Sequence, residues 1–281
     1  MTLYEAYKDA VKRLDNPDKD EISVRILLCH NNGIKSMSGF YIHKNENLRD
    51  FPGFLKNFEE FLAGKPIQYI LRESEFLGLN FYVDERVLIP RQETEQLVLE
   101  TEKLIKNELL NLQLNIADVC CGSGAIGLSL SKLLPESHFY LSDISKEAIG
   151  VSKTNAKNLN LEPKIEFLEG DMLKPFIKKG IKLDVIVCNP PYIKDITTID
   201  ERTLKQEPHL ALLADPDTMF YESLLMDVHK VLNDKYIIAF EIGEDMKESL
   251  EILVKKYCPN DEFYFQEDMY GKTRFLFIKH Q

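Results

Sequence analysis

The sequence of 281 residues contains no tryptophan and five cysteines, and no apolar run approaches the roughly 20 residues that a membrane-spanning helix needs. No two cysteines are spaced as C-x-x-C, and the adjacent Cys120 and Cys121 are poorly placed to bridge each other. These absences argue against a disulfide framework, a zinc site and a membrane span. They predict reduced thiols in a cytoplasmic protein without a bound metal.

Basic charge is also scarce. There are 35 Lys and Arg against 46 Asp and Glu, a formal net charge of −11. Residues 1–75 carry 11 basic and 12 acidic side chains, so residues 76–281 carry 24 and 34 and hold most of the excess. Direct nucleic-acid binding needs clustered Lys and Arg, and we do not expect it here. A solvated acidic surface or a protein partner with a basic face explains the charge.

The apolar pattern changes along the chain and predicts two domains joined by a linker. Residues 1–74 have helical periodicity and predict a small N-terminal helical bundle. Residues 75–90 alternate like a β-hairpin linker. In residues 91–281 helices alternate with strands, and two last strands surround the turn at residues 270–272. This predicts an α/β fold: a doubly wound, Rossmann-like, mostly parallel sheet that ends in an antiparallel hairpin.

The elements of the second domain are expected at definite places. The predicted strands are 114–119, 138–142, 164–168, 183–188 and 236–242, and the predicted helices are 92–109, 125–134, 146–159, 220–232 and 245–256. In such sheets ligands bind beyond the carboxyl ends of the strands, and the unusual residues of this chain lie at those ends.

A glycine-rich turn follows the first strand. Gly122, Gly124 and Gly127 fit the G-x-G-x-x-G pattern, which allows a tight turn and close approach of a ligand to the backbone. Asp143 lies about 20 residues further on, at the tip of the next strand, where an acid binds a ribose. This pattern alone is compatible with NAD or with any adenosine-containing cofactor.

Two further acids favour S-adenosyl-L-methionine. Asp118 directly precedes the turn, where it would repel a diphosphate but could pair with an ammonium group. Asp171 ends the third strand and is placed to accept a hydrogen bond from an adenine amino group. The alternative is that the glycines only turn the chain and the acids only cap helices.

The segment Asn189-Pro190-Pro191-Tyr192 ends the fourth strand. Two prolines cannot donate to the sheet ladder, so the chain leaves the strand stiff and extended. In such a domain this motif resembles that of methyltransferases that act on a planar nitrogen. The Asn189 side-chain oxygen and the Pro190 carbonyl would accept the two N–H bonds of the acceptor, and Tyr192 would pack against its flat face. The bland alternative is that the two prolines only terminate a strand.

Several blocks extend this likeness over nearly the whole chain. They are the segment GKPIQYILRESEFLGLNFYVDERVLIPRQETEQLV (residues 64–98), Glu207-Pro208 with Ala211-Leu212, the EIG of residues 241–243, and the terminal YGKTRFLF. The sequence thereby resembles the PrmC/HemK family of peptide chain release factor N5-glutamine methyltransferases. The segment of residues 64–98 is the most specific of these blocks.

The resemblance implies methyl transfer from S-adenosyl-L-methionine, which leaves S-adenosyl-L-homocysteine, to the glutamine of the Gly-Gly-Gln motif in class 1 release factors. The N-terminal bundle would recognise this partner, whose basic patch would suit the acidic charge, and we expect a monomer. The residues expected to bind the cofactor are Asp118, Cys120, Cys121, Gly122, Ser123, Gly124, Asp143, Asp171, Met172 and Asn189. Asn189, Pro190, Pro191 and Tyr192 would hold the glutamine.

The chain departs from the family pattern in places. Cys120 stands where the family usually has Gly, so we expect a negative φ there, and Gln92 replaces a proline. The loop after Glu207 lacks the usual Gly-rich turn. Glu207 and Glu241 are compatible with the active site, but also with helix caps or surface ion pairs.

Other functions stay open at this point. One is a glutamine methyltransferase that acts on a ribosomal protein, and a second is a nucleic-acid adenine amino-methyltransferase. A third is a scaffold that binds the cofactor without turnover. His138, His209 and His229 show no metal-ligand spacing, and we expect them on the surface or in loops.

Overall fold

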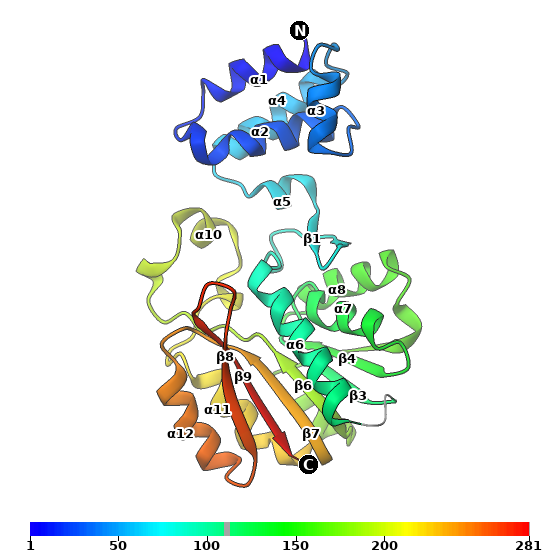
Figure 1. Cartoon of the computed structure of the whole chain (residues 1–281), viewed down its shortest axis with the longest axis vertical. Coiled ribbons are helices and arrows are strands. Elements are labelled where there is room, and N and C mark those ends of the chain that lie inside the picture. The colour runs from blue at the N-terminus through cyan, green and yellow to red at the C-terminus, as the bar shows by residue number, and fades with distance from the viewer. Residues whose placement is uncertain (110–112, 281) are drawn as a thin grey trace. The chain divides into compact units, whose positions relative to one another are not determined.

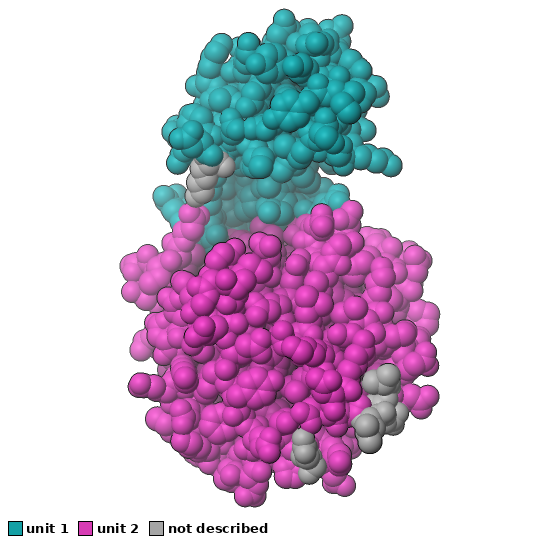
Figure 2. Space-filling view, in the orientation of Figure 1, with its two compact units in different colours: residues 1–73, 201–206 teal, residues 74–200, 207–281 magenta. Residues whose placement is uncertain are grey.

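The computed structural model describes residues 1–109 and 113–280, and the chain separates into two compact units (Figures 1 and 2). Unit 1 contains Met1–Glu73 and Glu201–Gln206, and unit 2 contains Ser74–Asp200 and Glu207–Gln281. The sequence suggests a boundary after residue 74 but does not predict that residues 201–206 group with the first unit. In the described residues, no helix combines the length and the apolar character needed to cross a membrane.

Unit 1 is helical. Its elements are α1 (Leu3–Val11), α2 (Pro17–Asn31), α3 (Met37–His43), α4 (Phe51–Leu62), α5 (Ile67–Leu71) and α10 (Glu201–Gln206). A capping box between Thr2 and Glu5 begins α1, and buried leucine and phenylalanine side chains from α1 to α4 form the core. On α10, Arg202 donates to both carboxylate oxygens of the buried Asp20 at 3.1 Å, which explains the grouping of α10 with this unit.

Unit 2 begins with a short hairpin and contains one seven-stranded sheet. The strands are β1 (Ser74–Phe76), β2 (Leu79–Phe81), β3 (Asn115–Val119), β4 (His138–Asp143), β5 (Ile165–Glu169), β6 (Leu183–Cys188), β7 (Leu232–Glu241), β8 (Glu262–Glu267) and β9 (Thr273–His280). The sheet order is β5-β4-β3-β6-β7-β9-β8, with parallel pairing up to β7 and antiparallel pairing of β9 and β8. The predicted fold class is confirmed.

Helices cover both faces of this sheet (Figure 1). α6 (Gln92–Glu108), α7 (Ala125–Leu133) and α8 (Lys146–Asn158) pack on one face, and α9 (Lys174–Lys179), α11 (Met219–Asp227) and α12 (Lys247–Tyr257) on the other. Because side chains alternate along a strand, neighbours such as Ile116 and Ala117 on β3 enter the two different cores. The described part of the unit also contains short 3-10 turns: η1 (Glu162–Lys164), η2 (Ile196–Thr198), η3 (His209–Ala211) and η4 (Val228–Lys230).

Some predicted elements differ in extent. The linker hairpin ends at Phe81. The Asp84 carboxylate accepts hydrogen bonds from the Tyr82 hydroxyl and the Arg86 side chain, and these bonds fold the following residues into a turn. β7 begins at Leu232, where a helix was expected to end, and the short helices α3, α5, α9 and α10 were not individually predicted. None of these differences alters the order of the parallel strands.

Candidate functional site

A pocket with about 870 Å³ of empty space opens at the carboxyl ends of β3, β4, β5 and β6. It is the edge at which ligands bind in sheets of this kind. Seven of the residues expected to hold the cofactor or the glutamine line it: Cys120, Gly122, Asp143, Asp171, Met172, Asn189 and Pro191. Pro208, Leu210 and Ala211, which follow the buried Glu207, form part of another wall.

The turn between β3 and α7 has the shape that the glycines predict. Gly124 precedes α7 with a φ of 81°, and a β-carbon there would lie 2.4 Å from the Ser152 hydroxyl, so only glycine fits. Asp143 stabilises the turn, since its carboxylate accepts from the backbone N–H groups of Gly122 and Ser145, each at 2.9 Å. Burial raises the pKa of Asp143. The carboxylate therefore faces the cavity with its position already fixed.

Asp118 lies behind the turn and not in the cavity. Its side chain is 1% exposed, one oxygen accepts from the Gly127 N–H at 2.8 Å, and the other has no hydrogen-bond partner within the described part of the chain. Burial raises its pKa to about 7, and the nearby charge of Asp143 adds to the shift. Asp118 does not line the cavity, and this geometry suits support of the turn from behind.

Cys120 has a φ of 63°, so the expected negative φ is wrong. The turn imposes the left-handed conformation whatever the residue, and the side chain is accommodated beside Met172, with the two sulfur atoms 3.8 Å apart. Met172 itself has a φ of 48°. Cys121, Ser123 and Gly124 belong to the turn but do not line the cavity, and the first two are buried.

The lining suits a nucleoside cofactor that carries an amine. Asp143 and Asp171 face the pocket, and Asp171 also pairs with Lys174; Arg86, which lines the pocket too, is paired with Asp84. Apolar side chains such as Ile144 and Val87 supply flat walls for a base. Because carboxylates accept from ribose hydroxyls and amino groups and repel phosphates, the pocket fits S-adenosyl-L-methionine better than a dinucleotide.

The Asn-Pro-Pro-Tyr segment leaves β6 beside this pocket. Asn189 and Pro191 line it, whereas Pro190 is buried and, like Tyr192, is not part of the lining. The Tyr192 hydroxyl lies 3.4 Å from a carboxylate oxygen of Glu241 at the end of β7. Burial, followed by the charge of Glu241, raises the pKa of Tyr192, so the phenol stays protonated.

Two buried groups adjoin this site: the sequence leaves Glu241 open as an active-site residue, but it does not single out Thr94. Thr94, in the first turn of α6, donates to Glu241 at 2.7 Å and lies 3.5 Å from the side-chain nitrogen of Asn189. Glu241 is 3% exposed, so the alternative of a surface ion pair for it is wrong. The residue pattern gave a signal in the segment of residues 64–98 and in EIG, but nothing in it shows that the two meet.

Glu207 is also buried, at 5% exposure. It accepts from the Ile89 backbone N–H at 3.1 Å and from the Arg91 guanidinium at 2.6 Å. The end of the linker is thereby joined to the loop that carries the pocket wall at Pro208. Glu207 is therefore neither a helix cap nor part of an exposed ion pair, which were the two alternatives left by the sequence.

Asn155 on α8 joins the linker to the glycine turn. Its amide oxygen accepts from the Tyr82 N–H at 2.6 Å, and its amide nitrogen donates to the Tyr82 and Ser123 carbonyls at 2.9 Å each. The side chain is fully buried. An asparagine in the middle of a predicted helix gives no signal of this role.

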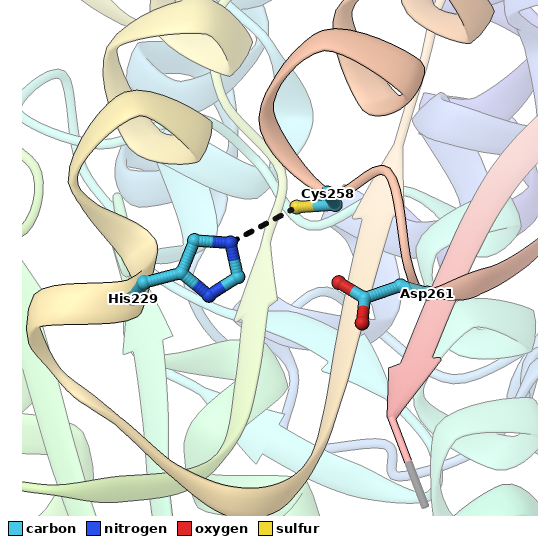
Figure 3. A group of neighbouring side chains, drawn as sticks. All are labelled: His229, Cys258 and Asp261. Atoms are coloured by element: carbon cyan, nitrogen blue, oxygen red, sulfur yellow. Dashed lines mark hydrogen bonds between the residues drawn. The ribbon is translucent and has the colours of Figure 1, made fainter.

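A second cluster of chemically active side chains lies at the opposite edge of the sheet, where His229, Cys258 and Asp261 have ligand-type atoms within 4.8 Å of one another (Figure 3). His229 Nε2 is 2.9 Å from a backbone carbonyl, and Asp261 accepts from Tyr236 at 2.5 Å and faces His280 Nδ1 at 2.7 Å. Burial, followed by the charge of Asp261, raises the pKa of Cys258 to about 12, and the Cys258 sulfur lies 4.0 Å from His229 Nε2. We interpret this group as a hydrogen-bonded cluster that tethers β7, β8 and β9.

Comparison with known proteins agrees with this geometry. Residues 96–209 match the family described as Methyltransferase small domain. A protein named release factor glutamine methyltransferase from Bacillus cereus is 37% identical over 286 residues, which covers 99% of each chain. A relative of the same name from Bacillus subtilis is 35% identical over 286 residues and covers 97% of this chain and 96% of its own.

Among solved structures, the hMettl16 catalytic domain in complex with the MAT2A 3'UTR hairpin 1 has a TM-score of 0.56 at 15% identity, covering 85% of this chain and 83% of that one. This likeness concerns the fold alone. Fold and pocket together define a class I methyltransferase of the S-adenosyl-L-methionine-dependent type. The chain belongs to the release factor glutamine methyltransferase family, which confirms the resemblance found in its motifs.

Proposed function

We propose that this protein transfers a methyl group from S-adenosyl-L-methionine to the side-chain amide nitrogen of the glutamine in the Gly-Gly-Gln motif of class 1 peptide chain release factors. The observation that carries the proposal is the position of Asn189, which lines the same pocket as Asp143 and Met172. An amide acceptor held at Asn189 would meet the reactive end of a nucleoside cofactor held at the strand ends. The names of the relatives support the choice of substrate.

The bound cofactor would supply an electrophilic methyl group on a sulfonium, and the protein would supply the positioning. Asp143 and Asp171 would hold the nucleoside through its hydroxyl and amino groups, and Asp118 would keep the glycine turn in place from behind. The amide oxygen of Asn189 and the carbonyl of Pro190 would accept the two N–H bonds of the glutamine. Such acceptors fix the nitrogen and direct its lone pair toward the methyl group.

Tyr192 would pack against the planar amide of the acceptor, with its hydroxyl anchored on Glu241. The raised pKa of Tyr192 keeps this ring neutral, so it acts through contact and not as a base. Methylation would leave the amide nitrogen cationic and acidic, and its proton could then pass to a water molecule, so no strong base would be required.

The test is mass spectrometry of a purified release factor after incubation with this protein and S-adenosyl-L-methionine. A gain of one methyl group on the glutamine of Gly-Gly-Gln is expected, and Asn189→Ala should slow it by about 10²-fold. Methyl transfer to a ribosomal protein or to nucleic acid, with none on the release factor, would leave the cofactor site intact and refute the proposed substrate.

The partner and setting follow from the same proposal. The N-terminal bundle would recognise the release factor, and the enzyme would act as a cytoplasmic monomer. Since residues 76–281 carry most of the negative charge, association with a basic partner should slow as salt increases. An association rate that does not change with salt would refute this electrostatic contribution.

A further inference from the structure

Three polar side chains from distant parts of unit 2 form a chain behind the pocket. Glu241 ends β7, Thr94 lies in the first turn of α6, and Asn189 follows β6. The Thr94 hydroxyl donates to Glu241 Oε2 at 2.7 Å, and Asn189 Nδ2 lies 3.5 Å from the same hydroxyl oxygen. Thr94 and Glu241 are 5% and 3% exposed, so solvent does not compete for the bond between them.

The chemistry of the three groups allows only one direction of hydrogen-bond donation, from Asn189 to Thr94 to Glu241. An ionised carboxylate can only accept, so the single hydroxyl proton of Thr94 is committed to Glu241. The Thr94 oxygen can then only accept from Asn189, which must present its NH₂ group to it. The amide oxygen of Asn189 is thereby turned away from Thr94, toward the pocket that Asn189 lines.

We propose that Thr94 and Glu241 are positioning residues that fix the side-chain amide of Asn189 with its oxygen facing the methyl acceptor. This inference rests on the proposed function, because an acceptor that presents two N–H bonds requires an oxygen at that point. If the Asn189 amide were flipped, its NH₂ group would face the NH₂ group of the methyl acceptor, and neither group would have a hydrogen-bond acceptor. Glu241 also accepts from Tyr192 at 3.4 Å. One carboxylate therefore binds Tyr192 directly and Asn189 through Thr94, at the two ends of the Asn-Pro-Pro-Tyr segment.

The direction depends on the charge of Glu241. Burial raises the pKa of this carboxyl and Glu93 adds to the shift, while the hydrogen bonds from Thr94 and Tyr192 and the charge of Arg274 oppose it. A protonated Glu241 could donate to Thr94, and the direction of donation through Thr94 to Asn189 could then reverse. The value of kcat should therefore fall as the pH drops through a pKa above the ordinary carboxyl range.

Thr94→Val removes the hydroxyl at nearly constant volume. Thr101→Val is its matched control, because Thr101 lies on the same helix, is fully buried, and has a hydroxyl without a hydrogen-bond partner in the described part of the chain. Thr94→Val should lower kcat for release factor methylation by about 10²-fold with KM changed less than about threefold. Thr94→Ser should restore most of the rate. Glu241→Gln should lower kcat less than Thr94→Val, because its amide oxygen can still accept from Thr94, and should lose the acidic limb of the pH profile.

Equal rates for Thr94→Val and Thr101→Val would overturn the proposal. A second readout does not need turnover: NMR of the full chain, labelled with ¹⁵N at asparagine. The Asn189 side-chain NH₂ should exchange slowly in the wild type and in Thr101→Val, and rapidly in Thr94→Val. If the wild type methylates no release factor, the proposed substrate fails, while this signal still decides whether Thr94 holds the amide: slow exchange retained in Thr94→Val overturns the positioning role.

Discussion

Among single residues, Cys120 has a backbone conformation that its side chain disfavours. A φ of 63° costs a residue with a β-carbon roughly 1–2 kcal/mol, and the turn before α7 requires that conformation. The side chain is only half-buried, so its contacts offset little of this cost. Strain of this kind at a ligand pocket is a result of the tight turn that brings backbone close to the cofactor.

Cys120→Gly should therefore raise the free energy of unfolding by about 0.5–1 kcal/mol, which is the strain relieved less the added flexibility of glycine in the unfolded chain. Thermal denaturation under reducing conditions measures the change. Cys120→Ser keeps the β-carbon and serves as the control, with little shift expected. Equal shifts for the two variants would show that the φ of residue 120 is not the cause.

At the scale of elements, the centre of the parallel sheet could be predicted because its strands are largely buried apolar runs that end in an acid, a glycine turn or a proline pair. β3, β4 and β6 follow that rule, and their ends meet in the pocket. Residues that line the pocket directly, such as Asp143 and Asn189, could be found in the same way.

The supporting residues could not be predicted, because their partners are remote in sequence. Thr94 and Glu241 are separated by 147 positions, and Asn155 and Tyr82 by 73. A buried threonine or asparagine within a helix has the same local pattern whether or not it has a partner. The positive φ of Cys120 was missed for a related reason, since the turn imposes it and the residue type argues against it.

Asn155 allows a test of how strongly α8 holds the linker and the glycine turn together. Asn155→Ala deletes three hydrogen bonds to backbone groups and should lower the free energy of unfolding by about 2–4 kcal/mol. The midpoint of urea unfolding measures this. Asn158→Ala, an exposed site on the same helix, should stay within about 0.5 kcal/mol of the wild type. A similar small change for Asn155→Ala would show that these bonds contribute little net stability.

At the scale of the whole molecule, the active site makes the fold sensitive to pH. Buried carboxyl groups surround the pocket, and burial raises the pKa values of Asp118, Asp143 and Glu241. The native state therefore binds protons that the unfolded chain has already released. Part of the formal net charge of −11 therefore comes from buried carboxyl groups, whose ionisation opposes folding.

Asp118 determines the pH range in which the free energy of unfolding changes. Its native pKa is about 7, whereas an unfolded aspartate titrates near pH 4, about three units lower. Between these values the native state holds more protons, so the free energy of unfolding falls as the pH rises. From pH 6 to pH 8 the loss should be about 1 kcal/mol, or roughly 2–4 °C in Tm for a domain of this size.

Scanning calorimetry of the wild type and Asp118→Asn over that range isolates the contribution, because Asn does not titrate. The variant should lose most of the decline in Tm between pH 6 and pH 8. Asp234→Asn removes the same charge at an exposed position and should keep the wild-type decline. If Asp118→Asn declines as steeply as Asp234→Asn, other groups account for the slope, and the carboxyl behind the glycine turn is ionised throughout.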